Sequence, residues 1–272
     1  LAAVAPGRAA TLDAGPLTIS IPDDGGVDGV SVAGTSVLNA GAQAASGFAV
    51  RDCAAGEEYV PLRGAITEQA GVLELALTAE QVNVELAATI MAWQNALEVR
   101  GTVRSQAEPP RCLSVRFALP VDLGGWRWHR DLNRTLSLND AATFENALPC
   151  GWGTGRMDLW PLAAVSSDAA TLCIATRMDE PALFRTQYLG EEGLLAISLD
   201  FGLSEHSKKF AREAPFRFFL YALDRPTGMR GALQRYYELF PELFVERTDK
   251  MGGWFAWGDI ARQPAPLCDF GL

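Results

Sequence analysis

An unusual concentration of aromatic and polar side chains lies between residues 124 and 160. Four of the 7 tryptophans in the chain fall in this stretch. Aromatic faces stack on the C–H faces of sugar rings, while arginine, aspartate and histidine side chains hydrogen-bond to the hydroxyls. The stretch therefore predicts a carbohydrate-binding surface. Its candidate residues are Trp126, Trp128, His129, Arg130, Trp152 and Arg156.

The spacing of the first two tryptophans also allows a second interpretation. Trp126 and Trp128 are two residues apart, which places both side chains on one face of a strand. That face could be the core of the protein, and Arg130 could pack on Trp128 within the same strand. Core packing and a ligand surface both remain open from the sequence.

Proton transfer at neutral pH would depend on His129 or His206, because the chain has 2 histidines. A sugar epimerase needs an acid and a base on opposite sides of the ring oxygen and the anomeric hydroxyl. His129 with Glu145 is one such pair, although their spacing does not select it. His206 lies in the polar segment 204–209, which is typical of a solvated loop. The sequence therefore assigns no catalytic residue.

The residue types and their spacing do not favour a metal or cofactor site. Two histidines exclude a multi-histidine centre, and the 5 cysteines are scattered without a Cys-x-x-Cys pair. We expect most of these thiols to be reduced and buried. The glycines of segment 151–155 lack the Gly-Lys-Ser/Thr ending of a phosphate loop. We therefore expect no metal and no cofactor.

The bulk composition restricts the partners and supports a large core. The chain has 272 residues, 49% of them hydrophobic, and a formal net charge of −10, which argues against nucleic acid as a partner. The longest apolar runs are strand-sized, far below the roughly 20 residues that cross a bilayer, so we expect no membrane partner. Leu1–Gly7 lacks the features of a leader and does not begin with Met. We expect a removed leader or a piece of a longer chain, and we slightly favour a secreted or periplasmic location.

The elements that must position these residues are mostly strands. Segments such as 97–103 and 113–119 alternate apolar and polar side chains, the period-two pattern of a half-buried antiparallel sheet. Many such segments follow one another, with no helix of ten or more residues before residue 226. The pattern predicts an all-β fold, a large two-sheet antiparallel β-sandwich that spans residues 1–223.

One segment after residue 223 reads as a helix, which begins at Pro226 or Thr227 and ends at Pro241. Apolar residues recur there at steps of three and four, the pattern of a helix with one buried face. They are Met229, Leu233, Tyr236, Tyr237 and Phe240. We predict a helical connector over residues 224–251. The apolar run 252–257 then predicts the first strand of an incomplete second domain over residues 252–272.

The C-terminal part of the chain resembles glycoside-hydrolase-like proteins. The resemblance is carried by segments 160–165, 199–203, 216–221 and above all 230–242, which leads to Gly253–Trp257. In such proteins a galactose-mutarotase-like β-sandwich precedes a (β/α)8 catalytic barrel, the Tyr-Tyr-x-x-Phe-Pro helix connects them, and a Gly-x-Trp strand opens the barrel. The resemblance implies a galactose-mutarotase-like supersandwich with a C-terminal connector helix and the start of a barrel.

The resemblance also implies that the catalytic carboxylates lie on barrel strands beyond residue 272. The main hypothesis is therefore an accessory β-sandwich region of a carbohydrate-active enzyme. It would bind an oligosaccharide or polysaccharide and pack on a barrel absent from this chain. Three alternatives remain: a stand-alone aldose-epimerase-like enzyme, a lectin-like carbohydrate-binding module, and a polysaccharide lyase accessory sandwich. The main hypothesis predicts an exposed aromatic patch or self-association through the C-terminal aromatic residues Phe240, Phe244, Trp254 and Trp257.

Overall fold

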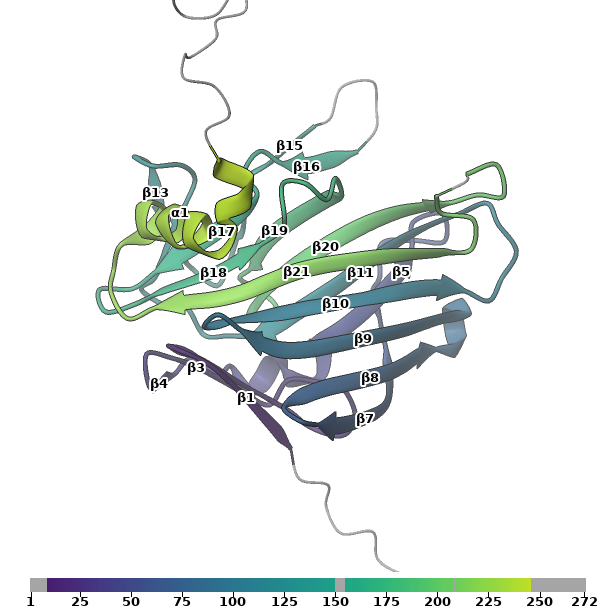
Figure 1. The fold of residues 1–272 in the computed structure, drawn as a ribbon, viewed down its shortest axis with the longest axis horizontal. Coiled ribbons are helices and arrows are strands. Elements are labelled where there is room, and N and C mark those ends of the chain that lie inside the picture. Colours follow the sequence, from purple (N-terminus) through teal and green to yellow (C-terminus); the bar gives the residue numbers. More distant parts are fainter. Residues whose placement is uncertain (1–8, 150–154, 208, 246–272) are drawn as a thin grey trace, which may run out of the picture.

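The computed structural model describes residues 9–149, 155–207 and 209–245. Its strands form two large antiparallel sheets, one of nine strands and one of six, that pack face to face (Figure 1). Two smaller sheets, of four and two strands, complete the β-structure. The predicted fold class, a large two-sheet antiparallel β-sandwich, is confirmed.

The strands of the two large sheets lie in an order that differs from their order in the sequence. The nine-stranded sheet contains, in spatial order, β13 (Thr135–Ser137), β12 (Arg127–His129), β17 (Leu162–Ser166), β18 (Thr171–Ala175), β21 (Glu213–Leu223), β10 (Ala96–Ser105), β9 (Val84–Trp93), β8 (Val72–Ala79) and β7 (Arg63–Gln69). The six-stranded sheet contains β14 (Thr143–Glu145), β19 (Leu183–Leu189), β20 (Leu194–Leu203), β11 (Arg111–Pro120), β5 (Gly47–Asp52) and β6 (Val60–Pro61).

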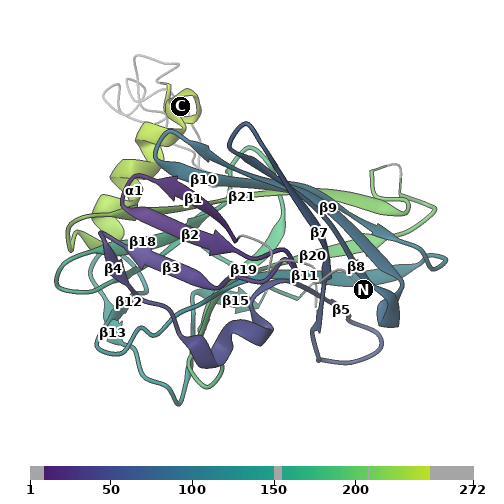
Figure 2. The ribbon, with the colours of Figure 1, turned by 90° about the horizontal axis from the view of Figure 1, so that it is seen from below.

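Small sheets and helical segments pack around this sandwich. Strands β1 (Ala10–Ala14), β2 (Leu17–Ile21), β3 (Gly29–Val32) and β4 (Thr35–Ser36) form the four-stranded sheet, which lies against β9, β10 and β21 (Figure 2). Strands β15 (Ala147–Pro149) and β16 (Arg156–Asp158) form the two-stranded sheet. The helical segments are η1 (Ala40–Ala45), η2 (Glu80–Val82), α1 (Gly228–Leu239) and η4 (Pro241–Phe244).

The main core lies between the two large sheets and follows the predicted alternation. On β10, Leu97, Val99 and Val103 are buried, while Arg100 on the opposite face is exposed. Three phenylalanines from β5, β11 and β21 form an aromatic cluster at the centre. The ring centroids are 4.9 Å apart for Phe48–Phe117 and 5.4 Å apart for Phe117–Phe218. Close-packed aromatic pairs of this kind contribute both buried area and specific edge-to-face contacts.

A second core lies outside the nine-stranded sheet, where α1 packs on β17 and β18 (Figure 1). The predicted helix is confirmed, although its buried face is turned from the predicted stripe. Ala232 and Leu239 are buried, whereas Tyr237 is 49% exposed. The sheet presents small side chains here, among them Ala164 and Cys173. They let the helix approach closely through Ala232.

The predicted exposure of Phe240 is wrong, because the sandwich itself buries this side chain completely. Its ring centroid lies 4.9 Å from that of Phe219, 5.7 Å from that of Trp93 and 4.8 Å from that of Tyr236. Phe244, one turn further along, remains 40% exposed. Trp254, Trp257 and the predicted strand at the start of segment 252–272 lie outside the described residues.

Candidate functional site

The two tryptophans of the predicted carbohydrate surface belong to the main core. Trp126 and Trp128 are both buried, and Trp128 has no exposed surface. The Trp128 Nε1–H group donates a 3.0 Å hydrogen bond to Oδ1 of Asn146, and the Asn146 amide in turn donates to the carbonyl oxygen of His129 at 3.0 Å. Of the two interpretations left open by the sequence, core packing is the one that matches this geometry. The indole of Trp128 presents no face on which a sugar could stack.

His129 points to the opposite side of β12, beneath the start of α1. Its Nε2 atom lies 2.8 Å from Oγ of Ser166. Burial and the charge of Arg127 lower the pKa of its imidazole. Gly228 opens α1 with a φ of +54°, and a Cβ atom at that position would lie 2.2 Å from Cε1 of His129. Glycine is therefore required where the helix meets this ring, and His129 supports the helix rather than an open cavity.

Arg130 and Arg156 each make their own set of contacts. Arg130 is exposed, and its carbonyl oxygen accepts a 3.2 Å hydrogen bond from Nε1 of Trp160. Arg156 pairs with Glu145 and donates to the carbonyl oxygen of Ala147 at 3.2 Å. Trp152 lies outside the described residues. Within the described residues, the structure links Trp128 to His129 through Asn146.

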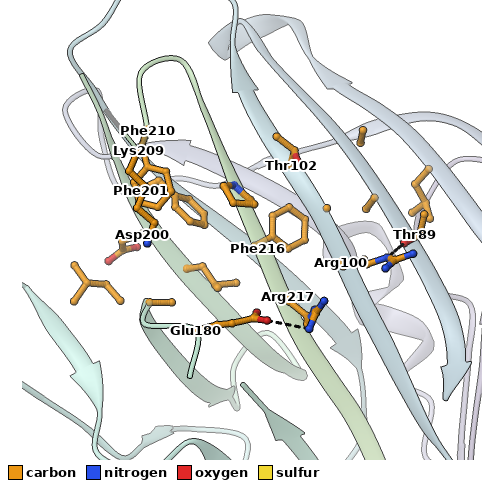
Figure 3. A pocket seen from close by; sticks show the side chains of 18 of the residues that line it. Thr89, Arg100, Thr102, Glu180, Asp200, Phe201, Lys209, Phe210, Phe216 and Arg217 are labelled. Atoms are coloured by element: carbon orange, nitrogen blue, oxygen red, sulfur yellow. Dashed lines mark hydrogen bonds and ion pairs between the residues drawn. The ribbon is translucent and has the colours of Figure 1, made fainter. Parts of the chain in front are cut away.

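A large groove lies instead on the outer face of the nine-stranded sheet, and its lining side chains are drawn in Figure 3. It involves β7, β8, β9, β10 and β21, whereas α1 packs on β17 and β18. Its volume is about 1310 Å³. Most of its floor comes from the exposed faces of β7, β8, β9, β10 and β21. One wall is formed by segment 179–183, and another by segment 199–202 with Lys209 and Phe210. We call this cavity the outer-face groove.

Strand register arranges the floor of the outer-face groove in two parallel rows that cross all five strands. One row is made mainly of small side chains: Ala65, Ala76, Ala87, Thr102 and Pro215. The neighbouring row is polar: Thr67, Glu74, Thr89, Arg100 and Arg217. Directly opposed residues in antiparallel strands share a face, so the register itself builds this pairing of a flat apolar strip with a polar strip.

The polar row presents both hydrogen-bond donors and hydrogen-bond acceptors. Arg100 is exposed and donates a 3.2 Å hydrogen bond to Oγ1 of Thr89. Arg217 donates to Glu180 at 2.9 Å and forms an ion pair with Glu98 at 3.2 Å. Figure 3 shows Arg100 and Arg217 on the floor of the groove, with Glu180 beside Arg217. Planar guanidinium and carboxylate groups at this spacing suit ligands that carry several hydroxyls.

The far end of the groove adds an aromatic ring. Phe210 is half-buried and packs edge-on against Phe201, with 6.2 Å between the ring centroids. The Lys209 ammonium lies 5.0 Å from the centroid of the Phe210 ring. The groove therefore combines an apolar strip, a polar strip and the aromatic side chains of Phe201, Phe210 and Phe216.

Sequence reasoning missed the outer-face groove because its residues come from five strands whose pairing is not visible in the sequence. A weak signal did exist. On β7, β8 and β9 the exposed face carries Ala65, Ala76 and Ala87, where solvent-facing strand positions usually carry polar residues. An alanine on the solvent side of three successive strands can mark a surface that a ligand covers.

No group of three histidine, cysteine, aspartate or glutamate residues within 9–149, 155–207 and 209–245 is placed to hold a metal ion. In the same part of the chain, no helix has the length and apolar character that would span a bilayer.

The sandwich with its outer helix defines the class of fold, a large antiparallel mutarotase-like sandwich. No family model matches the sequence, and no curated protein matches it. Among solved structures, the fold is similar to that of the GH36 α-galactosidase AgaA from Geobacillus stearothermophilus, in a variant complex with stachyose. That match has a TM-score of 0.50 and 12% sequence identity, and it covers 86% of this chain and 43% of the α-galactosidase chain. This chain thus spans less than half the length of that enzyme.

Two further structures align less closely. A complex of another AgaA variant with raffinose has a TM-score of 0.48 and 12% identity, with 86% of this chain and 43% of that chain covered. A galactose mutarotase-like protein from Lactobacillus casei ATCC 334 has a TM-score of 0.37 and 11% identity, with 79% of this chain and 100% of that chain covered. The expected mutarotase-like sandwich is confirmed at the level of the fold, while the expected start of a barrel lies outside the described residues.

Proposed function

We propose that this chain is the accessory β-sandwich region of a carbohydrate-active enzyme and that its outer-face groove binds an oligosaccharide. The row of small side chains that contains Ala65, Ala76 and Ala87 is called the alanine row. The observation that carries the proposal is that this alanine row lies beside the polar row on the groove floor. The similarity of fold to an α-galactosidase crystallised with stachyose supports the same class of ligand.

The chemistry of the floor fits a chain of sugar rings. The C–H faces of the rings would lie on Ala65, Ala76 and Ala87, whose small side chains leave a flat apolar surface. The hydroxyls would bind Arg100 and the other groups of the polar row, with hydrogen bonds from the charged groups stronger than those from neutral ones. Pockets for single small ligands usually have volumes of about 300–1,000 Å³. The groove volume of about 1310 Å³ therefore favours an oligosaccharide over a monosaccharide.

Two of the acidic residues around the groove, Asp179 and Asp200, suit the binding of hydroxyls rather than acid catalysis. Glycoside hydrolysis uses a pair of carboxyl groups, one of which is protonated as the general acid. Hydrogen bonds from Arg177 lower the pKa of Asp179. Burial alone would raise the pKa of Asp200, but hydrogen bonds from Arg185 and Ser114 outweigh burial and lower it. Both groups are held as carboxylates, which suits them to accepting hydrogen bonds from ligand hydroxyls.

The end of the described chain offers a contact surface for the rest of such an enzyme. Tyr237, Phe244 and Val245 are exposed at the C-terminal end of α1 and η4, and the ring centroids of Tyr237 and Phe244 are 4.4 Å apart. An exposed apolar group of this kind is typical of an interaction surface. We propose that this apolar surface packs on the barrel domain. Without the barrel, the same surface would lead the isolated chain to self-associate.

Calorimetric titration with stachyose and raffinose tests the proposal. We expect measurable binding by the full chain and at least a tenfold loss of affinity for Arg100→Ala. Arg104→Ala is the matched control, because Arg104 lies on the same strand and face but pairs with Glu213 outside the groove. Its affinity should equal that of the wild type. Absence of binding to both sugars and to a panel of other oligosaccharides would refute the proposed function.

A further inference from the structure

We infer that Cys53 and Cys112 form a dithiol site that closes to an intramolecular disulfide when the protein is oxidised. Strand register places the two residues opposite each other. Asp52, the last residue of β5, pairs with Leu113 of β11, so the next pair along the ladder is Cys53 with Cys112. The Cys53 N–H group donates a 2.8 Å hydrogen bond to the carbonyl oxygen of Cys112.

The geometry of this pair suits a disulfide. Opposed residues of a hydrogen-bonded antiparallel pair have Cα atoms about 5.5 Å apart, which lies within the usual Cα separation of disulfides. The two side chains leave the same face of the six-stranded sheet, because directly opposed residues always do.

A neighbouring ion pair holds the two strands in register. The Arg111 guanidinium donates to Oδ2 of Asp52 at 2.8 Å and to Oγ of Ser105 at 3.0 Å. The side chains of Arg111 and Asp52 are only 9% and 17% exposed. Closure of the disulfide therefore requires only side-chain rotation, within a backbone that is already fixed.

The exposures of the two thiols set the order of the reaction. Cys112 is exposed, Cys53 is only partly so, and both are free thiols in the structure. The Cys112 thiolate attacks one sulfur of a small-molecule disulfide such as oxidised glutathione, and the first glutathione thiolate leaves. Cys53 then loses its proton to solvent, attacks the Cys112 sulfur and releases the second thiolate. Two protein thiols are oxidised, and one glutathione disulfide is reduced to two thiols.

The cross-link would close a covalent loop that contains β7, β8, β9 and β10, the strands that carry most of the groove floor. A disulfide that closes a long loop restricts the unfolded chain and thereby stabilises the folded state. Cys112 also lies opposite Gly202 of β20, which lines the groove. The dithiol site thus lies beside the groove without forming part of its floor.

The test uses the full chain incubated with graded mixtures of reduced and oxidised glutathione. The reaction is then blocked with N-ethylmaleimide and mapped by proteolysis and mass spectrometry. We expect a cross-linked peptide that joins Cys53 to Cys112, loss of alkylation at both residues, and a rise in Tm of several degrees over the reduced protein. Cys53→Ser should abolish the cross-link and leave a glutathione adduct on Cys112.

A second variant keeps the test independent of the other thiols. Because strand register alone brings Cys53 and Cys112 together, a Cys150→Ser/Cys268→Ser protein should still form the Cys53–Cys112 cross-link. Three results would overturn the inference. They are full alkylation of both residues after oxidation, a persistent glutathione adduct on Cys112 of the wild type, and a cross-link that requires Cys150 or Cys268.

Discussion

The hydroxyl group of Tyr236 in α1 donates a 2.8 Å hydrogen bond to the carbonyl oxygen of Thr176 and accepts one of 3.1 Å from the N–H group of Met178. Thr176 directly follows β18, and Met178 lies two residues further on. Tyr221 of β21 adds a second link, because its hydroxyl donates to the carbonyl oxygen of Ala232 at 2.8 Å. Two phenols therefore fasten α1 to the nine-stranded sheet, and the predicted connector helix packs as part of the sandwich.

The substitution Tyr236→Phe should lower the free energy of unfolding by about 1–3 kcal/mol, because it leaves a buried backbone carbonyl without its donor. Urea denaturation monitored by tryptophan fluorescence measures this change. Tyr237→Phe is the matched control on the same helix, and it should change stability by less than about 0.5 kcal/mol because Tyr237 is exposed. Equal stability of the two variants would show that the Tyr236 hydroxyl does not fasten the helix.

The substitution Trp128→Phe should cost about 2–4 kcal/mol of stability, because it opens a cavity in the core and leaves Oδ1 of Asn146 without its donor. Chemical denaturation measures the loss, and calorimetry with stachyose should show unchanged affinity. Trp160→Phe is a milder comparison, since Trp160 is only partly buried. A stable Trp128→Phe protein that had lost sugar binding would mean that Trp128 belongs to the carbohydrate-binding surface.

Asp158 should make the protein less stable as pH rises from about 4 to 7. Burial raises the pKa of its carboxyl group to about 6, from a usual value near 3.8. Oδ2 accepts the N–H group of Thr186 at 2.9 Å, while the buried Oδ1 atom has no hydrogen-bond partner. The folded state therefore binds this proton more tightly than the unfolded state, and its contribution is complete below the unfolded pKa and is lost as pH passes about 6.

Comparison with Asp158→Asn isolates that contribution from the other carboxyl groups. Between pH 4 and pH 7 the stability of the wild type should fall relative to the variant by up to about 3 kcal/mol. Urea denaturation at several pH values measures the difference. A difference that does not change with pH would mean that Asp158 titrates normally in the folded state.

The sandwich was predictable because its strands repeat a simple local pattern. The alternation in segment 97–103 places Leu97, Val99 and Val103 inward, as the structure has them. Tertiary packing determines which face of a strand is buried where the alternation alone does not. Trp128 has the same local pattern whether its face is core or surface, and only the pairing of β12 with β17 places it inside.

The buried face of α1 and the floor of the groove also depend on tertiary packing, which the sequence pattern does not reveal. Periodicity located α1, but the choice between Tyr237 and Ala232 as a buried residue depended on the small side chains of the sheet beneath. The groove floor depends on long-range register, for example Ala76 opposite Ala87 and Arg100 opposite Arg217. Each of these residues looks like an ordinary solvent-facing position when its strand is read alone.

The most direct test of carbohydrate binding in the outer-face groove fills the groove itself. Ala87 lies exposed in the alanine row, and Glu85 lies on the same strand and face outside the groove. In calorimetric titrations with an oligosaccharide that the wild type binds, Ala87→Trp should abolish binding, while Glu85→Trp should bind as the wild type does. Unchanged affinity in a folded Ala87→Trp protein would contradict the assignment of the groove.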